Sequence, residues 1–149
     1  MMLQVKNLCV SYGAIKALKG ISFDVENGEI ISLIGSNGAG KTTTLHSVSN
    51  IIRKQSGSVF FEGEDISDMS ADKIVARNLI QVPEGRRVFA NLTVKENLEL
   101  GAYLRKDKAE IVRDMEKVFS LFPRLKERVR QAAGTLSGAP KIRACELIG

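Results

Sequence analysis

Apolar and polar residues alternate along the N-terminal part of the chain, and this pattern predicts β-structure there. LQVKNLCVSY (3–12) and KALKGISFDVENGE (16–29) both alternate like half-buried strands, and Asn27-Gly28 supplies a tight turn. EIISLI (29–34) is a short, continuous, β-branched run, which is typical of a strand covered on both faces in a parallel sheet. LIQVPE (79–84) predicts another strand.

Helical spacing separates these runs and makes the expected fold class α/β. TTTLHSVSNII (42–52) carries apolar residues at helical spacing, and SADKIVARN (70–78) predicts a short helix. SGSVFFEGEDI (56–66), which lies between them, reads as strand and turn.

Two capped helices follow in the second half of the chain. Thr93 with Glu96 begins the first, and Asp107 with Glu110 begins the second. Pro123 is expected to close the second helix.

Composition places the chain among ordinary globular proteins. Its 149 residues are 44% hydrophobic and 26% charged, which suits one domain. No apolar run approaches the roughly 20 residues that span a bilayer, and the N-terminus lacks a signal-peptide pattern, so we expect a cytosolic protein. Cys9 and Cys145 lack disulfide or zinc spacing and are interpreted as buried or incidental thiols.

The net charge of +5 permits contact with nucleic acid or an acidic membrane. However, basic and acidic residues alternate, only 5% of residues are aromatic, and Trp is absent. The pattern therefore disfavours a nucleic-acid partner.

A glycine-rich segment, GSNGAGKTTT (35–44), lies between an expected strand and an expected helix. It matches G-x-x-x-x-G-K-[ST] through Gly35, Gly40, Lys41 and Thr42. Glycines let the backbone aim successive N–H groups at one point, and the helix N-terminus adds partial positive charge. A polyphosphate fits such a loop, with Lys41 reaching the β- and γ-phosphates and the Thr42 hydroxyl helping to hold Mg²⁺. The alternative is a glycine-rich turn without a ligand; the elements on either side favour the phosphate site.

The base is expected to be adenine, because the chain has no N/T-K-x-D element for guanine. Three collinear stretches within residues 3–138 then resemble the ATP-binding subunit of ABC transporters. They are VSYGAIKALKGISFDVENGEIISLIGSNGAGKTTTL, LIQVPEGRRVFANLTVKENLELGAY and TLSG. The middle stretch is most similar to the branched-chain amino acid importers.

The resemblance implies an ABC-type P-loop NTPase fold with an N-terminal antiparallel β subdomain and a helical subdomain, and with the C-terminal part of the core missing. Residues 1–80 would form the P-loop core and β subdomain, 81–138 the Q-loop and helical subdomain, and 139–149 a divergent tail.

The resemblance also assigns site residues for ATP and Mg²⁺. Tyr12 matches the aromatic residue that stacks on adenine, and Gln81 matches the Q-loop glutamine that contacts Mg²⁺ and the attacking water. The alternatives are a tyrosine that caps the sheet and a polar residue at a strand end. Lys41 and Gln81 would be catalytic, and Thr42 and Gln81 would bind the metal. The full set expected to bind the nucleotide is Tyr12, Gly35, Ser36, Asn37, Gly38, Ala39, Gly40, Lys41, Thr42, Thr43, Ser137 and Gly138.

The same resemblance implies partners. Ser137 and Gly138 begin a signature motif that closes over the γ-phosphate bound by an opposite subunit, which implies a homodimer or a heterodimer with another ATP-binding subunit. EGRRVFANLTV (84–94) would dock on transmembrane permease subunits through Arg86, Arg87 and Phe89, at the inner face of the cell membrane. For the two arginines, ordinary solvated charge is the alternative.

The chain departs from the family pattern after Gly138. Ala139 and Pro140 replace the second glycine of the signature and the polar residue after it, and KIRACELIG (141–149) does not follow the family. The hydrolytic carboxylates and the switch histidine would lie beyond residue 149. Glu62 and Glu84 close apolar runs but do not fit the carboxylate position, and His46 is interpreted as a surface or packing residue of its helix.

These departures lead to the hypothesis that the chain is a truncated or altered subunit, with low stability or strong oligomerisation. An alternative is a non-hydrolysing regulatory module or inactive fragment, which background phosphate release with tight ATP binding would select. A nucleic-acid-associated P-loop protein is the third alternative, suggested by the pI alone.

Overall fold

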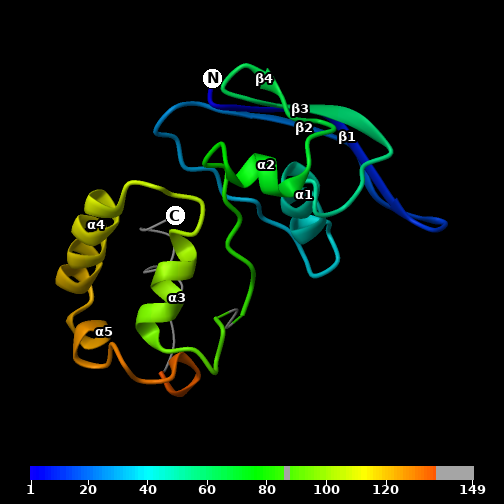
Figure 1. Ribbon diagram of the computed structural model, residues 1–149. Helices are drawn as coiled ribbons and strands as arrows, with labels where there is room; N and C mark the ends of the chain where they lie inside the picture. The colour runs from blue at the N-terminus through cyan, green and yellow to red at the C-terminus, as the bar shows by residue number, and fades with distance from the viewer. Residues whose placement is uncertain (86–87, 137–149) are drawn as a thin grey trace. The chain divides into compact units, whose positions relative to one another are not determined.

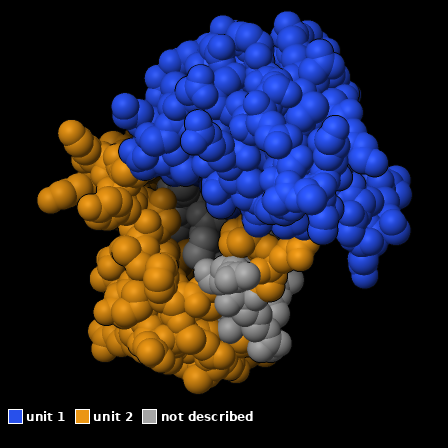
Figure 2. Space-filling view, turned by 90° about the vertical axis from the view of Figure 1, so that its right-hand side faces the viewer, with its two compact units in different colours: residues 1–81 blue, residues 82–149 orange. Residues whose placement is uncertain are grey.

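The computed structural model describes residues 1–85 and 88–136. Contacts divide the chain into two compact units, residues 1–81 and 82–149 (Figure 2). Arg86, Arg87, Ser137 and Gly138 lie outside the described residues, as do Ala139, Pro140 and the rest of the tail.

The first unit contains an antiparallel sheet with the strand order β2-β1-β3-β4. Its strands are β1 (Leu3–Tyr12), β2 (Ile15–Val25), β3 (Ser56–Phe61) and β4 (Glu64–Asp65). The strands expected from alternation before the glycine loop are therefore confirmed, as is the strand-and-turn prediction for residues 56–66.

An irregularity in β1 explains why its buried residues do not alternate perfectly. Val5, Leu8 and Val10 are all buried, and the register against β2 shifts between Val5 and Leu8. Asn7 in this stretch has a positive φ of 47°. The bulge adds one residue to the strand and so returns the following apolar side chains to the core face.

Two helices cover one face of this sheet: α1 (Lys41–Val48) and α2 (Ala71–Val75) (Figure 1). Both occur where helical spacing predicts them. The resulting core consists of Val5, Leu8, Val10, Leu18, Val48, Val59, Phe61, Ile66 and Ile74.

The second unit is helical in its described part. It contains α3 (Val94–Gly101), α4 (Lys108–Leu121), α5 (Pro123–Glu127) and the 3₁₀ turn η1 (Ala133–Thr135). Its core consists of Val94, Leu98, Ala102, Val118, Leu125 and Leu136. Throughout residues 1–85 and 88–136, the helices are too short or too polar to cross a membrane.

The first of the two predicted helix caps is confirmed. The Glu96 N–H donates to Thr93 Oγ1 at 3.2 Å, and the Thr93 N–H donates to Glu96 Oε2 at 2.7 Å. The two residues thus satisfy each other's backbone donors at the start of α3.

For the second helix, the predicted capping hydrogen bond is wrong. Asp107 precedes α4, but its side chain makes no capping hydrogen bond. It accepts instead from the Arg105 guanidinium, which also donates to Asp114 at 2.6 Å, and this pairing lowers the pKa of Asp107. A nearby guanidinium offers a carboxylate two charge-assisted bonds, which are stronger than one backbone N–H. Pro123 does follow the end of α4, but it also occupies the first position of α5, where its missing N–H costs nothing.

The two strands predicted at 29–34 and 79–84 are absent: the structure assigns neither segment to a strand. Ile30 and Ile34 are each 94% exposed. A parallel strand needs hydrogen-bonded neighbours and a cover on both faces. The described residues supply neither, whereas β1 and β3 find their partners within the same unit.

The exposed segment 29–34 should make the purified chain self-associate, because an exposed apolar run of this kind is a site for intermolecular contact. We expect Ile30→Lys combined with Ile34→Lys to shift the sedimentation coefficient to that of a monomer. The matched control is Ile15→Lys, which changes an isoleucine 72% exposed outside the segment and should leave association unchanged. A wild-type chain that is already monomeric would contradict this prediction.

Candidate nucleotide-binding site

The loop that leads into α1 depends on its glycines at three positions. Gly38 and Gly40 have φ angles of +85° and +90°, which L-residues rarely adopt. Gly35 needs no special φ, but a Cβ placed there would approach the Ala39 Cβ to 2.9 Å. The spacing of the motif is therefore a requirement of a tightly folded loop, and Gly40 is the N-cap residue of α1.

Lys41, the first residue of α1, bends back over this loop. Its Nζ donates to the carbonyl oxygens of Gly35 at 2.7 Å and Ser36 at 2.8 Å. The first N–H groups of a helix have no intrahelical acceptor, and the helix dipole adds partial positive charge at the same end. A cation and a helix start thus occur together, as an anion site requires.

The buried side of α1 is anchored by hydroxyl groups as well as by Val48. The Gly40 carbonyl accepts from both the Thr44 N–H at 2.8 Å and Thr44 Oγ1 at 2.9 Å. Ser47 Oγ donates to the Thr43 carbonyl at 2.7 Å. Thr44 and Ser47 are 2% and 0% exposed, so these bonds satisfy groups whose burial would otherwise be costly. Hydropathy periodicity gave no signal for them, because both residues are polar.

Tyr12 ends β1 next to the same helix. Its hydroxyl lies 3.4 Å from Thr43 Oγ1, a long hydrogen bond, and the residue is 49% exposed. The fold therefore brings together two predicted site residues that are 31 positions apart, and it leaves part of the ring open to a stacking ligand.

Gln81 shows the clearest sign of an unmet interaction. Among the described residues, its Oε1 atom is buried and has no hydrogen-bond partner. An unsatisfied buried acceptor costs roughly 1–3 kcal/mol, so such atoms occur where a ligand or water completes the site. An amide oxygen is a suitable ligand for Mg²⁺ or acceptor for a water. The sequence indicates the amide, but only the structure shows that it is unsatisfied.

The described residues also include His46, Phe89 and Cys9. His46 lies in the last turn of α1 and is half-buried, and Phe89 is 63% exposed. Cys9 is a free, half-buried thiol. The signature-like Ser137 and Gly138 fall outside the described residues, so their role stays a prediction.

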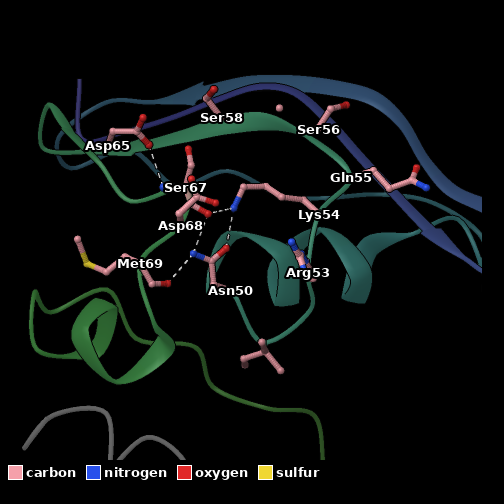
Figure 3. Close-up of a pocket in the computed structure, with 12 residues that line it drawn as sticks. Asn50, Arg53, Lys54, Gln55, Ser56, Ser58, Asp65, Ser67, Asp68 and Met69 are labelled. Atoms are coloured by element: carbon pink, nitrogen blue, oxygen red, sulfur yellow. Dashed lines mark hydrogen bonds between the residues drawn. The ribbon is translucent and has the colours of Figure 1, made fainter.

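A cavity of about 700 Å³ lies beyond the end of α1, and the residues that line it do not include the glycine loop (Figure 3). Asn50 organises it: its Nδ2 donates to the carbonyls of Ile66 at 2.8 Å and Met69 at 2.7 Å. Lys54 Nζ donates to Asn50 Oδ1 at 2.7 Å and to the Ser67 carbonyl. Asn50 thereby ties the end of α1 to the connection between β4 and α2.

The Lys54 ammonium is paired within this cavity rather than open to a ligand. Burial lowers the pKa of Lys54, while the carboxylates of Asp68 and Asp65 oppose that shift. The sequence analysis missed this cluster. An asparagine just after a predicted helix could have indicated it. Asn50 has a φ of +52°, and asparagine tolerates this left-handed region better than most residues.

A loop of this form, with a lysine folded over it and a helix behind it, defines a P-loop nucleotide-binding protein. The chain belongs to the ABC transporter family, whose model matches residues 18–145. Solved structures agree with this fold. The structure of an ATP-binding subunit of an ABC transporter has a TM-score of 0.85 at 28% identity, covering 99% of this chain and 61% of that one. An ABC cassette in its ADP conformation has a TM-score of 0.80 at 25% identity, covering 98% and 62%. The expected fold class is confirmed.

Curated relatives narrow the resemblance. The high-affinity branched-chain amino acid transport ATP-binding protein BraG of Pseudomonas aeruginosa is 46% identical over 137 residues, which are 92% of this chain and 58% of the relative. The probable branched-chain amino acid transport protein LivF of Archaeoglobus fulgidus is 33% identical over 94% of this chain and 59% of the relative. A lipopolysaccharide export protein, LptB of Haemophilus influenzae, is 38% identical over 70% and 44%. The chain thus spans less than three-fifths of the length of these relatives.

Proposed function

We propose that this chain is an ATP-binding subunit, or a nucleotide-binding part of one, that powers a membrane importer for branched-chain amino acids. The observation that carries the proposal is the Lys41 ammonium held over the glycine loop at the start of α1. The 46% identity to BraG supports the choice of solute. Relatives from an export system support the role of an ATP-binding subunit but not the choice of solute.

The loop residues would bind the phosphates of ATP. Backbone N–H groups of the loop would bind the phosphates, and Lys41 would exchange its two carbonyl acceptors for the β- and γ-phosphate oxygens. Phosphate oxygens carry more charge than carbonyls, so this exchange is favourable. Ser36, Asn37, Gly38 and Ala39 contribute backbone rather than side-chain chemistry.

Two further residues would complete the nucleotide and metal contacts. The half-exposed ring of Tyr12 would stack on adenine from the end of β1. The hydroxyl of Thr42 and the unsatisfied Oε1 of Gln81 would bind Mg²⁺ or its waters, which suits a cation that keeps several waters. Bound Mg·ATP would supply the phosphoryl group for hydrolysis, and the loop residues would hold and orient it.

Partners follow from the same proposal. Permease subunits would dock on segment 84–94, where Phe89 offers a largely exposed aromatic ring. Ser137 and Gly138 would reach the nucleotide of a second ATP-binding subunit. The subunit would then lie at the inner face of the membrane, attached through its permease.

Calorimetric titration of the purified chain with Mg·ATP tests this function, together with phosphate release over hours. Saturable binding with phosphate release supports an ATPase subunit. Tight binding with background release selects the non-hydrolysing regulatory module, and a folded chain without saturable heat contradicts both.

Replacing Gln81 with leucine should have opposite effects on stability and on metal dependence. Leucine removes the unsatisfied oxygen at similar volume, so we expect the free energy of unfolding to stay equal or rise by about 1 kcal/mol. The gain in ATP affinity that Mg²⁺ confers should fall severalfold. Titrations with and without Mg²⁺ measure this gain, and urea unfolding measures the stability. An unchanged Mg²⁺ dependence would remove Gln81 from the metal site.

A further inference from the structure

Two segments of the second unit, far apart in sequence, are bound together along their backbones. The Ala133 N–H donates to the Leu92 carbonyl at 2.8 Å, and the Gly134 N–H donates to the Ala90 carbonyl at 3.0 Å. In return, the Val94 N–H donates to the Gln131 carbonyl at 3.0 Å. Segment 89–95 and segment 129–136 therefore form a small antiparallel ladder, which includes the bridge between Thr93 and Ala132.

The side chain of Asn97 is hydrogen-bonded to the backbone of segment 89–95. It is 7% exposed, and its Oδ1 accepts from the Phe89 N–H at 2.9 Å. Its Nδ2 donates to the carbonyls of Phe89 at 3.0 Å and Thr93 at 2.9 Å. One buried amide thus satisfies both backbone groups of Phe89, a residue that is 63% exposed.

Gly134 allows segment 129–136 to approach segment 89–95 closely. A Cβ placed on Gly134 would lie 2.8 Å from the Ala90 Cβ and 3.0 Å from the Ala90 carbonyl oxygen. The glycine is required by packing, because no larger residue fits at this separation. Leu136, two residues on, is 7% exposed and belongs to the core with Val94 and Leu98.

We propose that Asn97 and Gly134 are positioning residues that make segments 89–95 and 129–136 one cooperative block. A partner that docks on Phe89 then acts on the same block from which the signature-like sequence begins, one residue after Leu136. This inference rests on the proposed function for its consequence, since that function assigns docking to segment 84–94. The block itself does not depend on ATP binding.

Hydrogen exchange of the full chain, read by mass spectrometry, tests the block through substitutions on one segment and readouts on the other. Asn97→Ala should speed exchange in residues 131–135 on the order of tenfold, although the hydrogen bonds of its side chain go to segment 89–95. Gly134→Ala should do the same at Val94 and Lys95. Exchange in β1 and β3 should not change, and neither should the affinity for Mg·ATP. Lys117→Ala, an exposed change on α4, is the matched control within the same unit.

A compensating pair keeps the test decisive if a single substitution unfolds the unit. Ala90→Gly removes the closest atom that the Cβ of Gly134→Ala would meet and leaves the contact with the Ala90 carbonyl oxygen at 3.0 Å, so the double variant should recover part of the lost protection. Failure of this rescue, or faster exchange confined to the substituted segment, would overturn the inference. If the wild-type chain does not bind ATP, the proposed function is refuted, but the inference about the block still stands.

Discussion

Replacing Lys41 with alanine is expected to weaken the binding of Mg·ATP on the order of a hundredfold. The ammonium makes two hydrogen bonds to loop carbonyls, and in the complex it would make charge-assisted bonds to phosphate oxygens in their place. Bonds to charged groups contribute about 1.5–3 kcal/mol each, and every 1.4 kcal/mol is roughly tenfold in affinity. Calorimetric titration of both proteins measures the ratio of dissociation constants.

The control for Lys41→Ala is Lys19→Ala, which removes one positive charge from an exposed residue of β2. If the loss were due to net charge alone, both variants would weaken binding equally. Equal affinities for wild type and Lys41→Ala would show that the glycine loop is not the nucleotide site. Circular dichroism should be unchanged, since the Lys41 ammonium bonds to exposed loop carbonyls.

Local patterns in the sequence predicted the elements whose partners lie close by. The alternation at 3–12 and 16–29 found β1 and β2, which pair directly with each other. Thr93 and Glu96 found the start of α3, because a capping box needs only residues within one turn. The glycine motif likewise specifies its own loop, since each of its constraints acts within the segment from Gly35 to Lys41.

Interactions between residues far apart in the sequence, or between competing side chains, could not be predicted from local patterns. EIISLI has strong β-propensity, but propensity expresses packing against neighbours, and the described residues supply none. Asp107 had two competing partners, and its choice of Arg105 depends on side-chain reach rather than on spacing. That Gln81 has an unsatisfied oxygen depends on burial, which a motif does not describe. The hydrogen bonds of Asn97 likewise depend on residues outside any motif.

Gly40→Ala should cost more stability than any other single change in the glycine loop. The residue has a φ of +90°, and an added Cβ would lie 2.7 Å from Leu18 Cδ2 and 3.1 Å from the Ala17 carbonyl oxygen. Backbone strain contributes about 1–2 kcal/mol, and overpacking against the buried Leu18 adds a further 1–3 kcal/mol. We expect a total loss of roughly 2–5 kcal/mol in the free energy of unfolding. Urea titration followed by circular dichroism measures it, because the chain has no tryptophan.

Gly38→Ala separates the two causes. Gly38 has a nearly equal φ of +85°, but no atom lies within 4 Å of the Cβ that alanine would add. It should therefore lose only the strain of about 1–2 kcal/mol. The difference between the two variants measures how tightly α1 is seated against β2. If both variants lost the same free energy, the contact with Leu18 would carry no cost, and the seating of the phosphate loop on the sheet would depend on backbone conformation alone.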